Sequence, residues 1–276
     1  LTRTPTLTLN LSPNPNPKPK LEGVGHGSLR TMFKKPHDLT ERSRARLKNS
    51  EVKKLKAALA AQFEADAADL ERIMPTKEGV LAVKLASKTV LYLHQPSETP
   101  LFFDKNGRKD YYPTLFVLWQ LPGLLKPLYT HAGVAPRLLG GADLMLPGVL
   151  PAAQDAAGAP LRDLRRGEKR AVLVLGNPMP CAVGSVPVDG DDLLATGLRG
   201  KGLQVAHVYG DVLYESGDRQ APEGFSDRGI TPCVALNELG LDMAILEEAY
   251  GSGGGGDGDG DDEDAAEAEA PPAAPA

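Results

Sequence analysis

The sequence predicts an α+β fold with two units between low-complexity ends. Apolar residues recur at helical spacing near the start, and short runs of branched and aromatic residues then alternate with turn-forming residues. Strands do not alternate with long helices, so a parallel sheet is not expected. Of the 276 residues, 41% are hydrophobic, which is enough to form packed cores. We expect a helix-and-antiparallel-sheet domain over 32–125, a mostly β domain over 126–217, and a linker with an acidic tail over 218–276.

Both ends have low-complexity sequence. Residues 1–31 hold alternating prolines and few apolar residues, so we expect them to be disordered. The sequence begins with Leu1 and "MFKK" begins at Met32, so a natural start at Met32, with residues 1–31 not native, is an expectation. Residues 251–276 carry eight acids and no base, which is typical of a flexible acidic tail, and their Asp-Gly repeats depart from the calcium-loop pattern. Residues 230–250 are assigned no role, and a short helix near their end or an unstructured linker both stay open.

Two helices are expected to open the first domain. Ser50 can cap a helix that has one apolar face. That face consists of Val52, Leu55, Leu59 and Phe63. A second, shorter helix passes through Leu70 and stops at Pro75, because proline cannot continue it.

Antiparallel strands and one more helix should complete this domain. The strands are expected at 79–86, 89–94 and 100–104, separated by turn-forming residues. "YYPTLFVLWQLPGLL" then predicts a helix with Pro113 in its first turn and Pro122 after its end. The single tryptophan, Trp119, is expected to face the core rather than to stack on a base.

Short, glycine-rich strands from Lys126 onward predict a small β-barrel. The strands are expected within 135–149, 168–176, 181–188 and 203–216, with one short helical insert at 189–198. Within "GGADLMLPG", Leu144 and Leu146 should alternate into the barrel core. Residues 140–142 should lie at the surface.

Charge is distributed unevenly along the chain. The formal net charge is −5, and because the tail holds eight acids, residues 1–250 carry +3. Nine bases lie between Met32 and Lys56, a density that fits contact with phosphates or with a partner, and a solvated helix face is the alternative. The candidate ribosome or partner contacts are Lys34, Lys35, Lys53, Lys54 and Lys56.

No catalytic site, metal site or cofactor is predicted. Cys181 and Cys233 form no CxxC pair and the five histidines lack ligand spacing, so reduced thiols are expected. "TGLRGKG" departs from a phosphate loop because Ala195 replaces its first glycine and Gly202 replaces the Ser or Thr after its lysine. GxSxG and HExxH are absent from the sequence. With no apolar run of bilayer length and no secretory pattern, we expect a cytoplasmic protein that is not an enzyme.

Several segments, in the same order, resemble a known family. "GGADLMLPGV", "RRGEKRAVLVLGNPMPCAVGSVPV" and "VAHVYGDVLYESG" resemble a PUA domain, the small pseudo-barrel named for pseudouridine synthases and archaeosine transglycosylases. Upstream, "MFKK", "IMPTKEG" and "LFFDKNGRKDYYPTLFVLWQLPGLL" resemble the ligatin (eukaryotic translation initiation factor 2D) proteins and the shorter malignant T-cell amplified sequence proteins. The resemblance covers Met32 to Gly217. It implies a pre-PUA α+β domain followed by a PUA pseudo-barrel.

The resemblance also implies a role in translation. Proteins of this group act on the small ribosomal subunit with tRNA in non-standard initiation, reinitiation or recycling, and their PUA domain contributes contact with tRNA or rRNA. Glycines let RNA approach main-chain groups, and neighbouring Arg and Lys bind phosphates. The candidate RNA-binding residues are Arg137, Gly140, Gly141, Ala142, Asp143, Met145, Pro147, Gly148, Arg199 and Lys201.

Two alternatives to this role stay open. Complete ligatins continue past the PUA domain, and nothing after Gly217 resembles their further domains. The chain is therefore either a truncated ligatin or a short form that works with a separate density-regulated partner protein. It could accordingly be a protein-interaction module that binds such a partner. PUA domains are also appended to RNA-modifying enzymes, so an accessory domain of such an enzyme is a third class.

Overall fold

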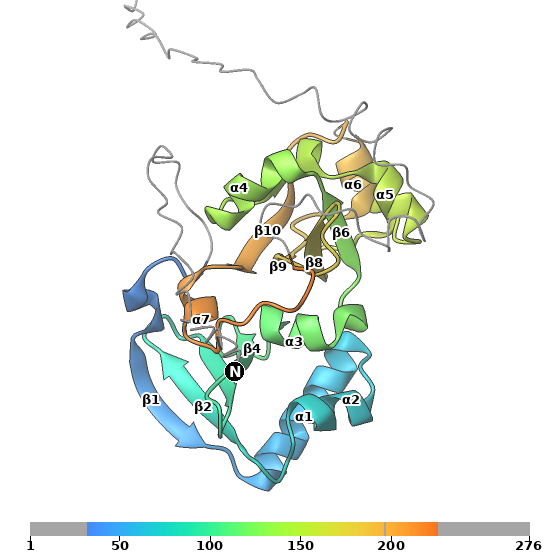
Figure 1. The fold of residues 1–276 in the computed structure, drawn as a ribbon. Coiled ribbons are helices and arrows are strands. Elements are labelled where there is room, and N and C mark those ends of the chain that lie inside the picture. Colours follow the sequence, from blue (N-terminus) through green and yellow to red (C-terminus); the bar gives the residue numbers. More distant parts are fainter. Residues whose placement is uncertain (1–31, 196, 226–276) are drawn as a thin grey trace, which may run out of the picture.

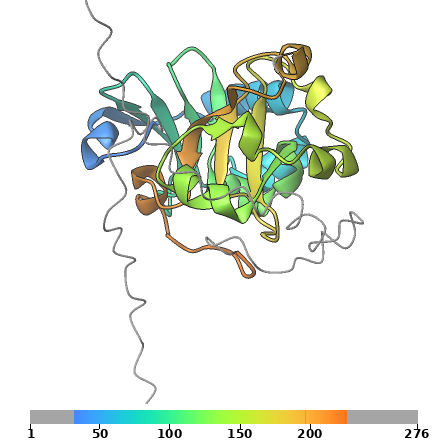
Figure 2. The ribbon, with the colours of Figure 1, turned by 90° about the horizontal axis from the view of Figure 1, so that it is seen from above.

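The computed structural model describes residues 32–195 and 197–225 (Figure 1). Our expectations for 1–31 and 226–276, including the Met32 start, the acidic tail and the state of Cys233, lie outside these residues. Within the described part, two five-stranded sheets have the orders β1-β2-β3-β4-β5 and β6-β8-β9-β10-β7. Seen from above, their strands lie side by side in the middle of the molecule (Figure 2). This is the α+β class that the sequence predicts.

The first sheet is antiparallel throughout and is accompanied by three helices. Its strands are β1 (Glu41–Arg46), β2 (Val80–Leu85), β3 (Val90–His94), β4 (Pro100–Asp104) and β5 (Tyr111–Pro113). The helices are α1 (Asn49–Phe63), α2 (Ala67–Ile73) and α3 (Leu115–Gln120), with a short 3-10 turn η1 (Pro36–Leu39) before β1. The three strands expected from the sequence are β2, β3 and β4.

The second sheet curls into the expected barrel-like unit. Its strands are β6 (Pro127–Thr130), β7 (Leu144–Met145), β8 (Lys169–Val174), β9 (Ala182–Ser185) and β10 (Lys201–Val208). β6 runs parallel to β8 and the other pairs are antiparallel. Around the sheet lie the helices α4 (Ala135–Leu139), α5 (Pro151–Ala156), α6 (Gly190–Ala195) and α7 (Val212–Glu215). The insert expected at 189–198 is α6.

Helix α1 has the predicted apolar face but a different start. Val52 and Leu59 are fully buried. The helix begins at Asn49 rather than after Ser50, because the Glu51 Oε2 atom accepts the Lys48 N–H at 2.8 Å and so makes Lys48 the capping position. The prediction that Ser50 caps this helix is wrong.

Strand β1 was not predicted, because its sequence "ERSRAR" contains one small apolar residue and all six side chains are exposed. Its backbone pairs with β2, with Arg44 opposite Val83, for example. This pairing holds the segment as a strand although its sequence lacks an apolar pattern. Of the nine bases of this region, three therefore lie on β1, three lie on α1 and three lie outside both elements.

Helix α3 begins two residues after Pro113, the proline that was expected in its first turn. Pro113 belongs to β5, and Thr114 is the capping position of α3. The Thr114 Oγ1 atom donates to main-chain oxygens of Pro100 and Leu101, at 2.7 and 3.0 Å, and so fixes the strand-to-helix turn. Trp119 is half-buried, and its Nε1 donates to the Pro180 oxygen at 2.9 Å across the two sheets. Trp119 thus packs within the fold, as expected.

Two stretches expected as strands contain helices. Pro136 stands in the first turn of α4, where its missing N–H costs nothing, so 135–139 is helical and β7 is limited to two residues. After β10, the Asp211 carboxylate accepts the Tyr214 N–H at 2.9 Å and starts α7. Local capping therefore overrides the strand pattern in both places.

The two sheets share one buried cluster. The Phe33 and Phe103 rings meet edge to face at 5.2 Å, and residues of β8, β9 and β10, including Ala206, pack into the same cluster. The backbone joins there too, since Met32 N donates to Ala206 O and Val212 N donates to Phe33 O. The two units consequently form one continuous interior.

Phe33→Ala should lower the free energy of unfolding by about 3–5 kcal/mol, because it removes a fully buried aromatic ring from this shared cluster. Urea denaturation followed by circular dichroism measures this change. Phe33→Leu, which keeps most of the volume, should cost distinctly less. A loss below about 1 kcal/mol for Phe33→Ala would contradict a shared interior.

Candidate nucleic-acid interface

The glycine motif begins where α4 ends. Gly141 has a φ of +85° and its N–H donates to the Leu138 oxygen at 2.8 Å, so this position ends the helix in a conformation that favours glycine. Gly140 is exposed, Ala142 is half-buried and Gly141 is buried. The expectation that all of 140–142 lies at the surface is therefore wrong for Gly141, whose main chain packs under the turn.

Asp143 faces inward and ties the motif to β10. Its Oδ1 accepts the Val205 N–H at 2.9 Å, and its Oδ2 lies 2.6 Å from the Lys201 Nζ. The Asp143 side chain is 5% exposed, whereas that of Lys201 is 28% exposed. This carboxylate compensates much of the Lys201 charge and satisfies a backbone donor, so its immediate role is to hold the turn in place.

Beyond Asp143 the chain alternates between core and surface. Leu144 and Leu146 are buried, as predicted, and Met145 between them is 48% exposed. Met145 lies opposite Lys201 in the β7–β10 pair. Gly148 is also buried. A Cβ there would lie 2.9 Å from Val134 Cγ2, so the site has little room for a side chain. The motif thus presents Met145 and the exposed Pro147 outward.

The structure brings most of the predicted RNA-binding residues together. The Arg137 oxygen accepts the Ala142 N–H at 3.0 Å, which places α4 beside the turn, and Leu146 N donates to Gly200 O at 2.8 Å, which places the 199–201 stretch beside β7. We call the outward-facing members of this group the motif surface. They are the exposed Arg137, Gly140, Met145, Pro147 and Arg199, with the partly exposed Lys201.

The predicted lysine contacts lie elsewhere and differ among themselves. α1 and α4 lie at opposite ends of the molecule, so Lys53 and Lys54 are far from the motif surface (Figure 1). Lys53 and Lys54 are exposed, as is Lys35, and Lys34 is half-buried. Lys56 is different, because its Nζ lies 2.5 Å from Glu71 Oε2 and donates to Thr76 Oγ1 at 2.9 Å.

The environment of Glu71 shows what Lys56 does. The Lys56 ammonium, together with hydrogen bonds from Thr76, lowers the pKa of Glu71 to about 2. Lys56 therefore joins α1 to the end of α2, and its charge is already used inside the protein.

Sequence reasoning missed the arginines of β1 as a group. Arg42, Arg44 and Arg46 alternate along this exposed strand. Arg44 is bound by Glu41 and Glu98, with N–O distances of 2.7 and 2.8 Å. The signal for them was the two-residue spacing of arginines in "ERSRAR", which places them on one face of a strand.

Within 32–195 and 197–225, no group of three or more His, Cys, Asp and Glu side chains is arranged to hold a metal ion. No helix among the described residues has the length and apolar character needed to cross a bilayer.

Comparison with known proteins matches the two sheets to two domain families. Residues 33–122 match the pre-PUA-like domain, and residues 125–212 match the PUA domain of eukaryotic translation initiation factor 2D. The rabbit (Oryctolagus cuniculus) translation initiation factor 2D is 34% identical over 195 residues, which cover 69% of this chain and 33% of the relative. Malignant T-cell-amplified sequence 1-B of Xenopus laevis is 29% identical over 184 residues, covering 66% of this chain and 97% of the relative.

A solved structure from an archaeon is similar over part of this chain. A hypothetical protein from Pyrococcus horikoshii superposes with a TM-score of 0.49 and 21% identity, covering 63% of this chain and 99% of that one.

The fold and the matches define a two-domain protein with a pre-PUA domain and a PUA domain. Together the two matched segments make up more than half of the 276 residues. The chain is related to eukaryotic translation initiation factor 2D and to the malignant T-cell-amplified sequence proteins, and it spans about a third of the length of the factor 2D relatives it matches.

Asp143→Ala should lower the free energy of unfolding by about 2 kcal/mol, because the Val205 N–H loses its acceptor and Lys201 loses its partner. Met145→Ser, two residues away on the exposed side, should stay within about 0.5 kcal/mol of the unsubstituted protein. Urea titrations of both variants measure the difference. Equal stability would show that Asp143 does not hold the turn.

Proposed function

We propose that this protein is an RNA-binding translation factor of the cytoplasm. It acts on the small ribosomal subunit together with tRNA, in non-standard initiation, reinitiation or recycling. The motif surface contacts tRNA or rRNA. Lys53 and Lys54 contact the ribosome or a partner from the other end of the molecule, and Lys35 does so from its position before η1. Support comes from relatives that are named translation initiation factors and from a PUA match that includes the whole motif.

The observation that supports the proposal most directly is that some residues of the glycine motif are buried and hold the turn, while others are exposed. Asp143, Gly141 and Gly148 are turned inward and hold the main chain in one conformation. Arg137 and Met145 are turned outward beside an exposed glycine. A preformed turn with a cation and an apolar side chain suits an RNA backbone and an unstacked base, because phosphates take the cation and a base or ribose takes the apolar contact.

The same geometry narrows the set of proposed contacts. Asp143, Gly141 and Gly148 act as supports for the surface, and Lys56 acts as a support for α1. The direct RNA contacts that we propose are Arg137, Gly140, Met145, Pro147, Arg199 and the exposed part of Lys201.

The full-length chain should sediment with small ribosomal subunits at low salt and be released as salt rises, because each phosphate contact displaces counterions. Sucrose-gradient centrifugation over a salt series measures this. Absence from the subunit fractions at every salt concentration would refute the proposal. Association that is insensitive to salt would favour the alternative, in which an apolar surface binds a density-regulated-type protein.

Charge reversal separates the motif surface from general attraction. Arg137→Glu should weaken subunit binding and reduce the slope of log affinity against log salt by about 1 or more. Arg162→Glu is a matched control, since Arg162 is an equally exposed arginine of the same domain outside the motif surface. If both variants bind alike, the contact does not run through the motif surface.

A further inference from the structure

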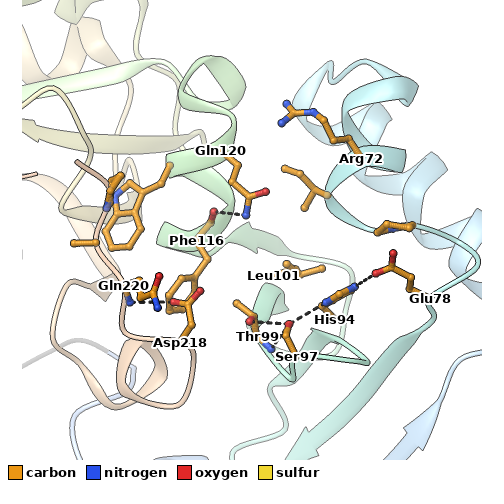
Figure 3. A pocket seen from close by; sticks show the side chains of 15 residues that line it. Arg72, Glu78, His94, Ser97, Thr99, Leu101, Phe116, Gln120, Asp218 and Gln220 are labelled. Carbon is orange, nitrogen blue, oxygen red and sulfur yellow. Dashed lines mark hydrogen bonds and ion pairs between the residues drawn. The ribbon is translucent and has the colours of Figure 1, made fainter. Parts of the chain in front are cut away.

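A cleft of about 630 Å³ lies at the junction of the two domains, and none of the proposed RNA contacts lines it (Figure 3). Arg72 of α2 and Gln120 of α3 stand at its edge, His94 and Ser97 line it from the β3–β4 hairpin, and residues 218–222 form a further wall. Its volume falls in the range of about 300–1,000 Å³ that is typical of binding pockets.

The floor of the cleft is apolar. Leu101 of β4 and Phe116 and Trp119 of α3 line it, and the Trp119 and Phe116 rings meet edge to face at 5.8 Å. The polar wall is already hydrogen-bonded, since His94 Nδ1 lies 2.9 Å from Ser97 Oγ and its Nε2 contacts Glu78. With both ring nitrogens of His94 engaged, this wall orients the hairpin. Leu101 and Phe116 are each 3% exposed, so the half-buried Trp119 is the apolar floor residue with surface open to an occupant.

The chain leaves the described region at this cleft. After α7, Tyr214 Oη donates to the Arg219 oxygen at 2.7 Å and turns the backbone along the cleft wall. The Phe225 ring then packs on Trp119 at 5.4 Å and on Tyr209 at 4.6 Å. Phe225 is thus fixed on the same tryptophan that lines the floor. Residue 230 follows five residues later and is within about 17 Å of this point even in an extended chain.

The sequence that follows contains an apolar stripe. Leu236, Leu239, Met243, Leu246 and Tyr250 follow one another at spacings of three and four residues. Such spacing places apolar side chains on one face of a helix, which is stable once that face is covered.

We propose that residues 230–250 of the same chain dock into this cleft, with the stripe against the half-buried Trp119 at its floor. Amphipathic segments bind grooves in this way through anchors at helical spacing. A tether of four residues, 226–229, gives a local concentration of the order of millimolar, so a weak intrinsic affinity suffices to fill the cleft. The contact holds the segment after the PUA domain in a cleft that none of the motif-surface residues lines. It does not depend on RNA binding.

Trp119 reports on this contact directly, because it is the single tryptophan of the chain. In the full-length protein, Met243→Asp puts a carboxylate on the stripe, which disfavours burial in an apolar cleft, and should raise acrylamide quenching of Trp119 roughly twofold. Leu241→Asp adds the same charge on the opposite face of the stripe and should leave quenching unchanged. Equal quenching in the two variants and the unsubstituted protein would overturn the proposal.

Cross-linking then tests which part of the cleft is occupied. Cys233 precedes Leu236 by three residues and falls on the same stripe, so in Gln120→Cys it should form an intramolecular disulfide under mild oxidation. Cys181 does not compete, since it is buried and burial raises its pKa to about 12. Peptide mass spectrometry identifies the linked pair.

Glu223→Cys is the matched control, because Glu223 is exposed, lies closer to the tether and does not line the cleft. The proposal predicts the link with Gln120→Cys, its loss when Met243→Asp is added, and little link with Glu223→Cys. Equal yields at both positions would indicate random collision of the tether. A disulfide between two molecules would assign the cleft to a second copy. Either result would overturn docking within one chain.

Discussion

The packing of Phe33 between the two domains is the constraint on which the rest of the structure depends. This residue precedes the first sheet, yet its ring meets Phe103 of that sheet and His207 of the second, at centroid distances of 5.2 and 6.3 Å. His207 is itself fixed, since its Nδ1 lies 2.8 Å from the Asp211 carboxylate that also starts α7. The PUA sheet therefore cannot move against the pre-PUA sheet without opening a buried cluster. A motif surface at one end and exposed lysines at the other are consequently held at a fixed separation, as two contacts with one large particle would require.

A second interaction, that of Asp143 with Val205 and Lys201, determines which residues of the glycine motif the PUA domain exposes. Asp143 is the most hydrophilic residue of the glycine motif, yet its carboxylate binds the Val205 N–H and Lys201 instead of facing solvent. Because a buried carboxylate removes negative charge from the surface, no acid of the motif competes with Arg137 and its neighbours for the phosphates that we propose they contact. The geometry separates the residues that support the turn from those that are exposed on it.

Much of the fold could be predicted from the sequence, and the failures have physical causes. Apolar periodicity gave α1 and the strands β2 to β4, because their side chains pack on one face. Strand β1 was not predicted because its strand conformation depends on backbone pairing with β2. Its exposed arginines give no apolar pattern that would indicate a strand. For the candidate site, the alternation in the motif correctly predicted that Leu144 and Leu146 are buried. The inward direction of Asp143 and the engagement of Lys56 with Glu71 depend on partners 62 and 15 residues away, which local sequence does not reveal.

The most direct test of the central claim is to map which residues touch RNA on the small ribosomal subunit. Ultraviolet cross-linking of the full-length protein bound to small subunits and tRNA, followed by mass spectrometry of nucleotide-linked peptides, gives that map. The account predicts cross-linked peptides from the stretch between Arg137 and Pro147 and from the neighbourhood of Arg199. Cross-links confined to other parts of the chain, with the glycine motif free of RNA, would contradict it.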